Sequence, residues 1–169
     1  MIKRELYMNR IRPFIGGELI KVMTGIRRSG KSVMLELIKE ELAEAGVAPS
    51  QMISINFEDM RYSHLQTATA LHDEIIKRAE GIEGKAYLFF DEIQEVEGWE
   101  KCVNSLRVAL DCDIYITGSN AKLLSGELAT YIGGRYVEFV IYPFSFAEFL
   151  ELYHTIAPSD SIQQCFQKY

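Results

Sequence analysis

The sequence predicts an α/β fold in which helices cover a mainly parallel β-sheet, and two observations carry this prediction. First, short apolar segments with strand character alternate with longer segments whose apolar residues recur at helical spacing. Second, residues 86–93, AYLFFDEI, form a continuous apolar run, as expected of a buried central strand. Neither internal repeats nor low-complexity stretches interrupt the alternation.

Each element is justified by its local pattern. The first half of the chain predicts strands over 19–24 (LIKVMT) and 52–57 (MISINF), and helices over 31–46 and 66–80. The second half predicts strands over 86–93, 113–118 and 136–143, and helices over 98–110 and 119–132. Pro143 stops the last strand, and Ser145 with Glu148 three residues later predicts a capped final helix.

Composition and charge exclude several classes of protein. The 169 residues are 48% hydrophobic and 25% charged, which is the composition of one ordinary globular domain. A net charge of -6 argues against a whole-surface binder of nucleic acid or anionic membrane. No apolar run reaches the ~18 residues of a membrane helix, and the charged N-terminus is unlike a signal peptide. The three cysteines form no C-x-x-C pair and the three histidines show no ligand spacing, so we expect reduced thiols, no zinc site and a cytoplasmic protein.

Residues 24–32, TGIRRSGKS, contain the pattern Gly-x-x-x-x-Gly-Lys-Ser between a strand and a helix. Glycines permit the backbone to turn its amides toward phosphate oxygens, a lysine reaches the β- and γ-phosphates, and a serine hydroxyl ligates Mg²⁺. The alternative is a glycine turn that caps an ordinary helix. The motif predicts that a nucleotide contacts Gly25, Ile26, Arg27, Arg28, Ser29, Gly30, Lys31, Ser32 and Val33.

An acidic pair ends the predicted central strand about sixty residues later. Asp91 is in the right place to hold Mg²⁺ opposite Ser32, and it is the second predicted metal-binding residue. Glu92 is the candidate general base that polarises the attacking water, with Lys31 as its catalytic cation. The alternative is that both carboxylates form a solvated strand terminus.

Polar residues also follow the fourth predicted strand. If this strand lies between the glycine-loop strand and the Asp91 strand, Ser119 or Asn120 can hydrogen-bond the γ-phosphate or its water. The alternative is that Ser119 caps the following helix. The sequence does not choose between Ser119 and Asn120 as the phosphate sensor.

The chain resembles the AAA-type P-loop ATPases of bacteria and archaea, in the branch whose loop reads Gly-x-Arg-Arg-x-Gly-Lys-Ser. The resemblance rests on RELYMNRIRPF, TGIRRSGKS, INFED, LFFDEIQEVEGWE, ITGSNAKLL, GGRY and YPFSFAEF, which cover nearly the whole chain in order. It implies a three-layer sandwich around a five-stranded parallel sheet of order 5-1-4-3-2. It also implies that Asp91 and Glu92 are the Walker B pair.

The resemblance adds two expectations outside the loop. Arg135 lies where such proteins often keep an arginine finger that reaches a neighbouring subunit's γ-phosphate, the alternative being a pair with a surface carboxylate. The N-terminal segment 1–18 is expected near the adenine through Tyr7, Ile11 or Phe14, the alternative being ordinary packing on the sheet.

The two adjacent arginines of the loop need a separate explanation. Because the loop's amides face the phosphates, the side chains of Arg27 and Arg28 point mostly away. The nearest acidic partners in the expected topology are Glu58 and Asp59. We expect one arginine to pair there and brace the loop.

These observations predict an ATPase that binds ATP with Mg²⁺, hydrolyses it slowly and couples hydrolysis to conformational change in a larger protein. Alternatives are an ATP-dependent switch with little turnover, and a P-loop kinase, against which no acceptor site can be recognised. Residues 1–154 are the expected ATP-binding domain, and 155–169 the start of a truncated lid or C-terminal region. The expected partners are a second copy of the chain and an unidentified protein; the charge does not indicate nucleic acid.

Overall fold

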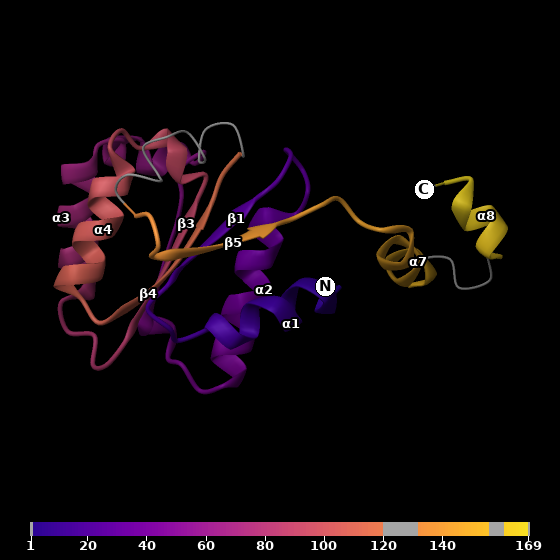
Figure 1. The fold of residues 1–169 in the computed structure, drawn as a ribbon, viewed down its shortest axis with the longest axis horizontal. Coiled ribbons are helices and arrows are strands. Elements are labelled where there is room, and N and C mark those ends of the chain that lie inside the picture. The colour runs from indigo at the N-terminus through magenta and orange to yellow at the C-terminus, as the bar shows by residue number, and fades with distance from the viewer. Residues whose placement is uncertain (1, 120–131, 156–160, 169) are drawn as a thin grey trace.

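A computed structural model describes residues 2–119, 132–155 and 161–168, and a five-stranded parallel sheet lies at its centre (Figure 1). The strands are β1 (Ile20–Thr24), β2 (Met52–Asn56), β3 (Ala86–Asp91), β4 (Cys112–Thr117) and β5 (Tyr136–Val140). Their order across the sheet is β2-β3-β4-β1-β5, and every adjacent pair is parallel. Read from the opposite edge this is 5-1-4-3-2, so the predicted fold and strand order are confirmed.

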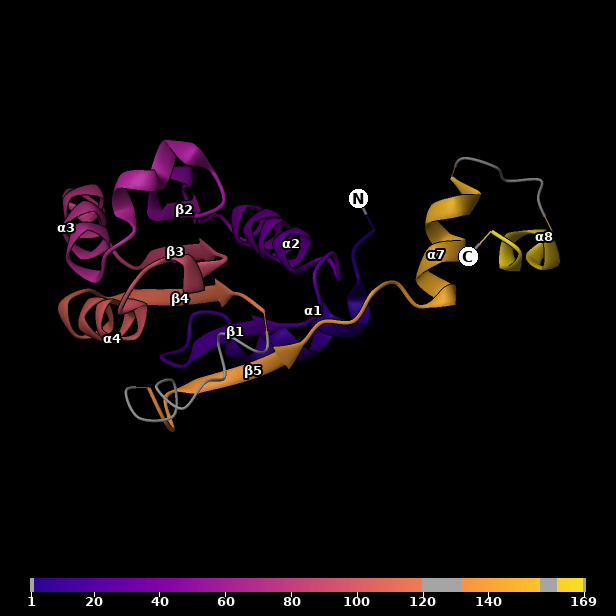
Figure 2. The same cartoon turned by 90° about the horizontal axis from the view of Figure 1, so that it is seen from above.

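Helices cover both faces of this sheet. The α-helices are α1 (Glu5–Ile11), α2 (Lys31–Glu44), α3 (Ala68–Ala79), α4 (Trp99–Ala109), α7 (Phe146–His154) and α8 (Ile162–Phe166). Short 3-10 helices cover Arg12–Phe14, Pro49–Gln51, Met60–Leu65 and Ile93–Glu95. The two views place α1 and α2 on one face and α3 and α4 on the other (Figures 1 and 2). None of the helices in the described segments is both long and apolar enough to span a bilayer.

Two apolar cores hold the three layers together. Because side chains alternate along a strand, β1 sends Val22 to one core and Met23 to the other. The first core joins the sheet to α3 and α4 through residues such as Leu71 and Leu106. The second joins it to α1 and α2 through residues such as Ile38, which is fully buried. β1 is buried along its whole length, so the loop that follows it starts from a rigid base.

Four strands end earlier than the sequence predicts, β2 and β4 by one residue and β3 and β5 by more. The strand expected over 136–143 ends at Val140, three residues before Pro143. The amide of Ile141 still donates to Thr24 O at 2.7 Å, but the next amide, of Tyr142, donates to a side-chain hydroxyl instead. The strand expected over 86–93 ends at Asp91, because Glu92 adopts the left-handed conformation at φ 56°.

The C-terminal helices lie beyond the carboxyl end of β5, away from the sheet, in both views (Figures 1 and 2). The capping box predicted at the start of α7 is present. Ser145 Oγ accepts from the amide of Glu148 at 3.3 Å, and Glu148 Oε2 accepts from the amide of Ser145 at 2.8 Å. The helix predicted over 119–132 falls mainly on residues 120–131, outside the described segments.

Candidate phosphate-binding site

The turn between β1 and α2 needs glycine at two positions, for different reasons. A Cβ on Gly25 would lie 2.2 Å from Ile141 O, so the main chain after β5 leaves no room for a side chain. Gly30 has φ 94°, in the left-handed region that favours glycine, and a Cβ there would lie 2.9 Å from Arg4 Nη1. The loop therefore owes its shape to contacts with two other parts of the chain.

Lys31 begins α2 and points its ammonium group back over the loop. Its side chain is only 5% exposed, yet its contacts are long: Nζ lies 3.4 Å from both Gly25 O and Ile26 O. The nearest carboxylate oxygen, Glu92 Oε1, is 3.6 Å away. A buried ammonium group with contacts of this length keeps most of its capacity to bind an anion.

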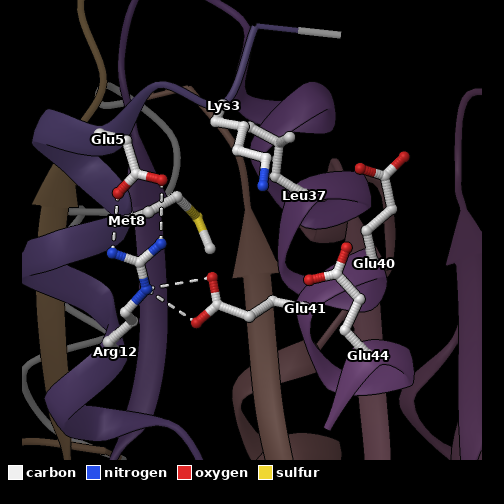
Figure 3. A pocket seen from close by; sticks show the side chains of 8 residues that line it. All are labelled: Lys3, Glu5, Met8, Arg12, Leu37, Glu40, Glu41 and Glu44. Carbon is white, nitrogen blue, oxygen red and sulfur yellow. Dashed lines mark hydrogen bonds and ion pairs between the residues drawn. The ribbon is translucent and has the colours of Figure 1, made fainter.

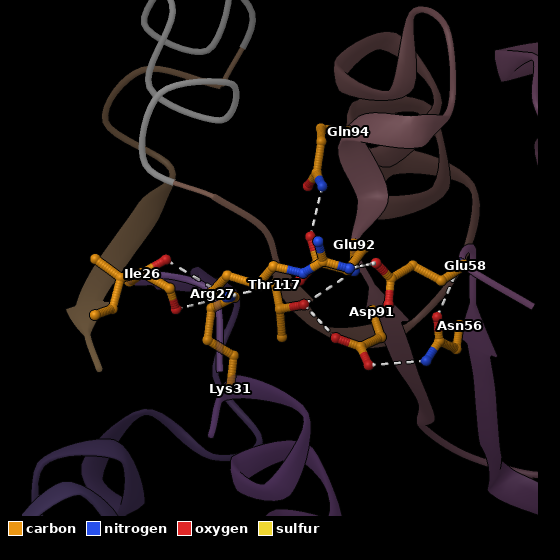
Figure 4. A network of polar contacts seen from close by, with 10 residues as sticks. Ile26, Arg27, Lys31, Asn56, Glu58, Asp91, Glu92, Gln94 and Thr117 are labelled. Atoms are coloured by element: carbon orange, nitrogen blue, oxygen red, sulfur yellow. Dashed lines mark hydrogen bonds and ion pairs between the residues drawn. The ribbon is translucent and has the colours of Figure 1, made fainter. Parts of the chain in front are cut away.

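Asp91 ends β3, and its carboxylate is held between the two neighbouring strands (Figure 4). Asn56, the last residue of β2, donates from Nδ2 to Asp91 Oδ2 at 3.2 Å. Thr117, the last residue of β4, donates from Oγ1 to Asp91 Oδ1. Both carboxylate oxygens are thus positioned at the carboxyl edge of the sheet, near the start of α2.

Glu92 leaves the strand in the left-handed conformation, which directs its side chain toward Lys31. Its amide donates to Thr117 Oγ1 at 2.9 Å, so the same threonine positions both members of the acidic pair. Its carboxylate accepts from Gln94 Nε2 at 2.5 Å and remains 19% exposed (Figure 4). A partly exposed carboxylate can both accept a proton and contact solvent.

Gly30, Lys31 and Glu92 line one cavity of about 440 Å³, whereas the buried Asp91 lies outside its lining. Its lining brings the helix start, the loop arginines and the two glutamates together: Arg27, Arg28, Gly30, Lys31, Ser32, Val33, Glu58 and Glu92. Ser32 and Val33 are exposed within it, whereas Ser29 is buried beneath the loop. The structure therefore brings together most residues that the loop motif singles out, with Glu92 opposite them.

Arg27 pairs with the acidic segment that follows β2, as expected for one of the two arginines. Its Nη2 lies 3.8 Å from Glu58 Oε1, and the two side chains are 88% and 60% exposed. Asp59 has a different partner, because Arg61 donates to its carboxylate at 2.6 and 2.8 Å. The hydrogen bond from Arg61 lowers the pKa of Asp59. Arg28 is exposed and has a left-handed φ of 65°.

The predicted phosphate sensor falls at the border of the described residues. β4 lies between β1 and β3, which is the arrangement that the sensor hypothesis requires. The amide of Gly118 donates to Met23 O at 3.3 Å, so the chain passes beside the end of β1 before reaching the half-buried Ser119. Asn120 lies outside the described residues, and the choice between Ser119 and Asn120 stays open.

Arg135 lies at the amino end of β1 and β5, whereas the glycine loop follows the carboxyl end of β1. Its carbonyl oxygen accepts from the amide of Ile20, the first residue of β1, at 2.9 Å. Its exposed side chain donates from Nη1 to Asn104 Oδ1 at 3.1 Å, an amide oxygen and not the carboxylate of the alternative interpretation. The structure does not bring Arg135 to the cavity of its own chain.

The N-terminal segment packs on the sheet and α2. Tyr7 and Ile11 are buried in the second core, and the ring of Phe14 meets Phe139 edge-on at 5.7 Å. These contacts match the packing alternative for the three side chains. Contact of segment 1–18 with adenine stays a prediction.

A second, smaller cavity of about 200 Å³ lies between α1 and α2 (Figure 3). Arg12 crosses it and donates to Glu5 and to Glu41, each at 2.8 Å. The hydrogen bond from Arg12 lowers the pKa of Glu5. This cavity contains none of the loop residues, and its central charges are paired with one another.

Sequence reasoning missed three residues of the site, Asn56, Gln94 and Arg4, and it placed Thr117 among the polar groups at the end of the fourth strand without its contact to Asp91. Asn56 and Thr117 carry a usable signal, because each is the polar last residue of a strand beside the Asp91 strand. Gln94 and Arg4 carry none, since their contacts depend on a left-handed turn and on an N-terminal segment far away in sequence.

A parallel sheet with a glycine loop between β1 and α2 and an acidic pair at the end of β3 defines the P-loop nucleotide-binding class of folds. Within that class, a family model described as an AAA domain matches residues 18–150, and the chain belongs to this family. Membership of this family indicates a nucleotide-binding domain of the ATPase class.

Comparison with curated proteins finds two relatives in distant organisms. A Haemophilus influenzae protein described as uncharacterized is 44% identical over 169 residues, which are 100% of this chain and 42% of that protein. A Methanocaldococcus jannaschii protein described in the same way is 41% identical over 133 residues, 78% of this chain and 28% of that protein. The chain thus spans less than half the length of each relative.

Solved structures show the same fold at low sequence identity. Orc1 of Aeropyrum pernix, in complex with DNA, has a TM-score of 0.63 at 18% identity, covering 94% of this chain and 50% of that one. AMPPCP-bound DnaA of Aquifex aeolicus has a TM-score of 0.57 at 16% identity, covering 94% and 52%. Both likenesses concern the fold alone.

Proposed function

We propose that the chain binds ATP with Mg²⁺ and hydrolyses it slowly. The observation that carries this proposal is the convergence of Lys31 and Glu92 in one cavity at the carboxyl edge of the sheet. A buried ammonium group with only long contacts suits phosphate oxygens, and a carboxylate opposite it suits proton removal from water. The family and the AMPPCP-bound neighbour support the same ligand class.

The residues present fit a magnesium nucleotide. Gly25 and Gly30 adopt positive φ values of 150° and 94°, which allow the loop to turn its amides toward a phosphate. Ser32 and Asp91 offer the hydroxyl and carboxylate oxygens that Mg²⁺ prefers, and we assign the metal to them. Bound MgATP would supply the phosphoanhydride to be cleaved and neutralise part of its charge.

We assign a separate role in binding or hydrolysis to each polar residue of the site. Lys31 would hold the phosphate charge, and Thr117 keeps Asp91 and the backbone of Glu92 in fixed positions. Glu92 would accept a proton from water at the mouth of the cavity. Ser119 or Asn120 would report on the phosphate, because the segment after β4 passes beside the end of β1.

The hydrogen bond between Gln94 and Glu92 favours slow turnover. It also supports a second candidate function, an ATP-dependent switch with little turnover. The Glu92 carboxylate is already hydrogen-bonded by Gln94 and faces Lys31. Oε2 accepts from Gln94 and Oε1 faces Lys31, so the attacking water must reach Glu92 beside these two contacts. This competition favours slow turnover, and measured ATP turnover separates an ATPase from a switch.

The decisive variant is Glu92→Gln. It should keep MgATP binding and lower turnover by about 10²- to 10⁴-fold, because an amide cannot act as a general base. Asp91→Asn should instead weaken the Mg²⁺-dependent part of binding. The matched control is Glu58→Gln, the same change in the other glutamate of the cavity lining, which should turn over at nearly the wild-type rate. Identical behaviour of Glu92→Gln and Asp91→Asn in both assays would refute this division of roles.

We further propose that Arg135 acts as a finger between copies of the chain. It lies at the amino end of the strands, away from its own loop at their carboxyl end, so only a neighbouring subunit can bring a nucleotide to it. An arginine finger is worth about 10³- to 10⁵-fold in rate where it operates. Specific activity should rise steeply with protein concentration and lose this rise in Arg135→Ala but not in Arg78→Ala, a surface arginine of α3. A dilute monomer that already matches the assembled protein, with Arg135→Ala unchanged, would contradict the finger.

We also assign residues 1–154 to the nucleotide-binding unit and 155–169 to the start of a further region. The two relatives are more than twice as long as this chain. We therefore assign the coupling of hydrolysis to that further region, and to a partner protein, to the whole protein and not to this chain alone.

A further inference from the structure

Arg4 is a buried arginine that joins three segments far apart in sequence. Its side chain has 0% exposure. Nη1 donates to Ser29 O in the glycine loop and Nε to Glu148 Oε1 in α7, both at 2.8 Å. Nη2 donates to Tyr142 O, in the connection between β5 and α7, at 2.7 Å. One guanidinium group thus links the loop, the exit of β5 and the first turn of α7.

The surroundings of Arg4 require the planar guanidinium shape. Its Cζ lies 4.6 Å from the ring centroid of Tyr7 and 5.0 Å from that of Phe144. The hydroxyl of Tyr7 accepts from the amide of Tyr142, which fixes the same connection a second time. A lysine has no planar fork of donors and cannot make these three hydrogen bonds at once.

The contact with the loop falls on a peptide bond that matters for phosphate binding. The peptide bond between Ser29 and Gly30 is trans, so its C=O and N–H point in opposite directions. Arg4 holds the carbonyl oxygen on the buried side of the loop, while Gly30 lines the cavity. Arg4 therefore directs the Gly30 amide toward the cavity, where an amide of a phosphate loop is needed.

The contact with α7 falls on Glu148, in the first turn of this helix. Glu148 uses Oε2 to accept from Ser145 in the capping box and Oε1 to accept from Arg4. Partial burial acts to raise the pKa of Glu148, but hydrogen bonds from Arg4 and Ser145 outweigh burial and lower the pKa. The carboxylate is therefore ionised at neutral pH, when it both caps α7 and binds Arg4.

We propose that Arg4 is a positioning residue that couples the phosphate loop to α7. When a phosphate draws the Gly30 amide inward, the opposed Ser29 carbonyl is fixed against Arg4, and Arg4 is fixed against Glu148 and Tyr142. Nucleotide binding and the docking of α7 then favour each other, and by linkage each strengthens the other by the same factor. This inference rests on the proposed nucleotide site and adds a route from that site to the helix that follows the sheet.

The test measures ADP affinity and the hydrogen exchange of α7 in the same full chain. MgADP is used because it is not consumed. Calorimetry gives its affinity, and mass spectrometry follows exchange in the first turn of α7, where the amide of Phe149 donates to Ser145 O. In the unsubstituted chain, MgADP should slow this exchange about five- to tenfold, the lower part of the usual range of such coupling.

Glu148→Gln cuts the link without removing a core residue, because glutamine at this position still completes a capping box. It should weaken MgADP binding by about the coupling factor and abolish the exchange response of α7. Arg4→Lys should have the same two effects. The matched control is Glu151→Gln, the same change at an exposed position of the same helix, which should alter neither quantity.

The outcomes separate this inference from the nucleotide site itself. Binding of MgADP without any exchange response of α7 overturns the coupling alone. A Glu148→Gln chain that keeps both affinity and response also overturns it. Absence of MgADP binding in the unsubstituted chain overturns the proposed nucleotide site, and the coupling with it.

Discussion

Two buried lysines lie near opposite ends of β1, and each faces a carboxylate. Lys21, near the amino end, lies 2.5 Å from Asp113 with both side chains at 0% exposure. Lys31, after the carboxyl end, lies 3.6 Å from Glu92, and these side chains are 5% and 19% exposed. Both pairs join a buried lysine to a carboxylate, but their N–O distances differ by about an ångström and only the second pair has access to solvent.

The amino-end pair is part of a complete hydrogen-bond network. Lys21 Nζ also donates to Gly17 O at 2.9 Å, and Asp113 Oδ2 accepts from Gly16 N at 2.6 Å and Tyr115 Oη at 2.7 Å. Burial lowers the pKa of Lys21, against the opposing effect of Asp113. Burial, followed by the charge of Asp113, raises the pKa of Tyr115. This network ties the turn before β1 to the sheet.

The difference teaches how to tell a structural lysine from a ligand-binding one. At the amino end each charge has close partners within the protein, so nothing further is needed there. At the carboxyl end the contacts of Lys31 are 3.4 to 3.6 Å long and the group borders a cavity. The sequence identifies Lys31 as a ligand-binding lysine, because it belongs to the glycine-loop motif. It gives no role to Lys21, which is a single charged residue within an apolar strand.

Breaking the amino-end pair should have the largest effect on stability. Lys21→Met leaves Asp113 buried and charged without its partner, which should lower the free energy of unfolding by about 3–5 kcal/mol. Urea unfolding measures this change directly. The double variant Lys21→Met with Asp113→Leu should recover most of the loss, because it removes both charges together.

The control for this prediction is the nearby exposed pair of Lys85 and Asp111, whose Nζ–Oδ1 distance is 2.7 Å. Lys85→Met should change the free energy of unfolding by at most about 1 kcal/mol, because solvent screens this pair. Equal losses for Lys21→Met and Lys85→Met would show that depth does not distinguish them. ATP affinity of the folded Lys21→Met chain should stay at the wild-type value.

The carboxyl-end lysine should behave in the opposite way. Lys31→Ala should weaken ATP binding at least about tenfold and leave the fold intact, because the lost contacts within the protein are long whereas those to phosphate are charge-assisted. Calorimetric titration measures the affinity, and circular dichroism checks the fold. Lys39→Ala, on the same helix and paired with Glu36, is the control and should bind ATP normally. Unchanged affinity in Lys31→Ala would remove the phosphate-loop interpretation.

The sheet was predictable because its signals are local or cumulative. Continuous apolar runs such as 86–91 show burial on both faces, and helical spacing in α2 shows where the chain returns. Strand ends were less predictable, since Val140 and Asp91 end their strands through contacts made by Tyr142 and by a left-handed Glu92. Those contacts depend on partners that are distant in sequence.

The site was predictable where a motif fixes the spacing and not elsewhere. Gly25, Gly30 and Lys31 belong to one short pattern, and the structure places the two glycines where a Cβ would meet other atoms. Arg4 has no such pattern, although it contacts the same loop. Its role depends on how an N-terminal segment, a loop and α7 pack against one another, and no short sequence pattern predicts that packing.

Arg27 should show the smallest effect of all, although it lies in the middle of the loop. Its contact with Glu58 is 3.8 Å long and both side chains are largely exposed, whereas Arg4 contacts the same loop at 2.8 Å with no exposure. Arg27→Ala should change the free energy of unfolding by less than about 0.5 kcal/mol and ATP affinity by less than about twofold. Urea unfolding and calorimetric titration, run beside Arg4→Lys, measure both quantities. A tenfold loss of affinity in Arg27→Ala would mean that this side chain turns inward to the phosphates, and that the exposed pair with Glu58 is not the arrangement that binds ATP.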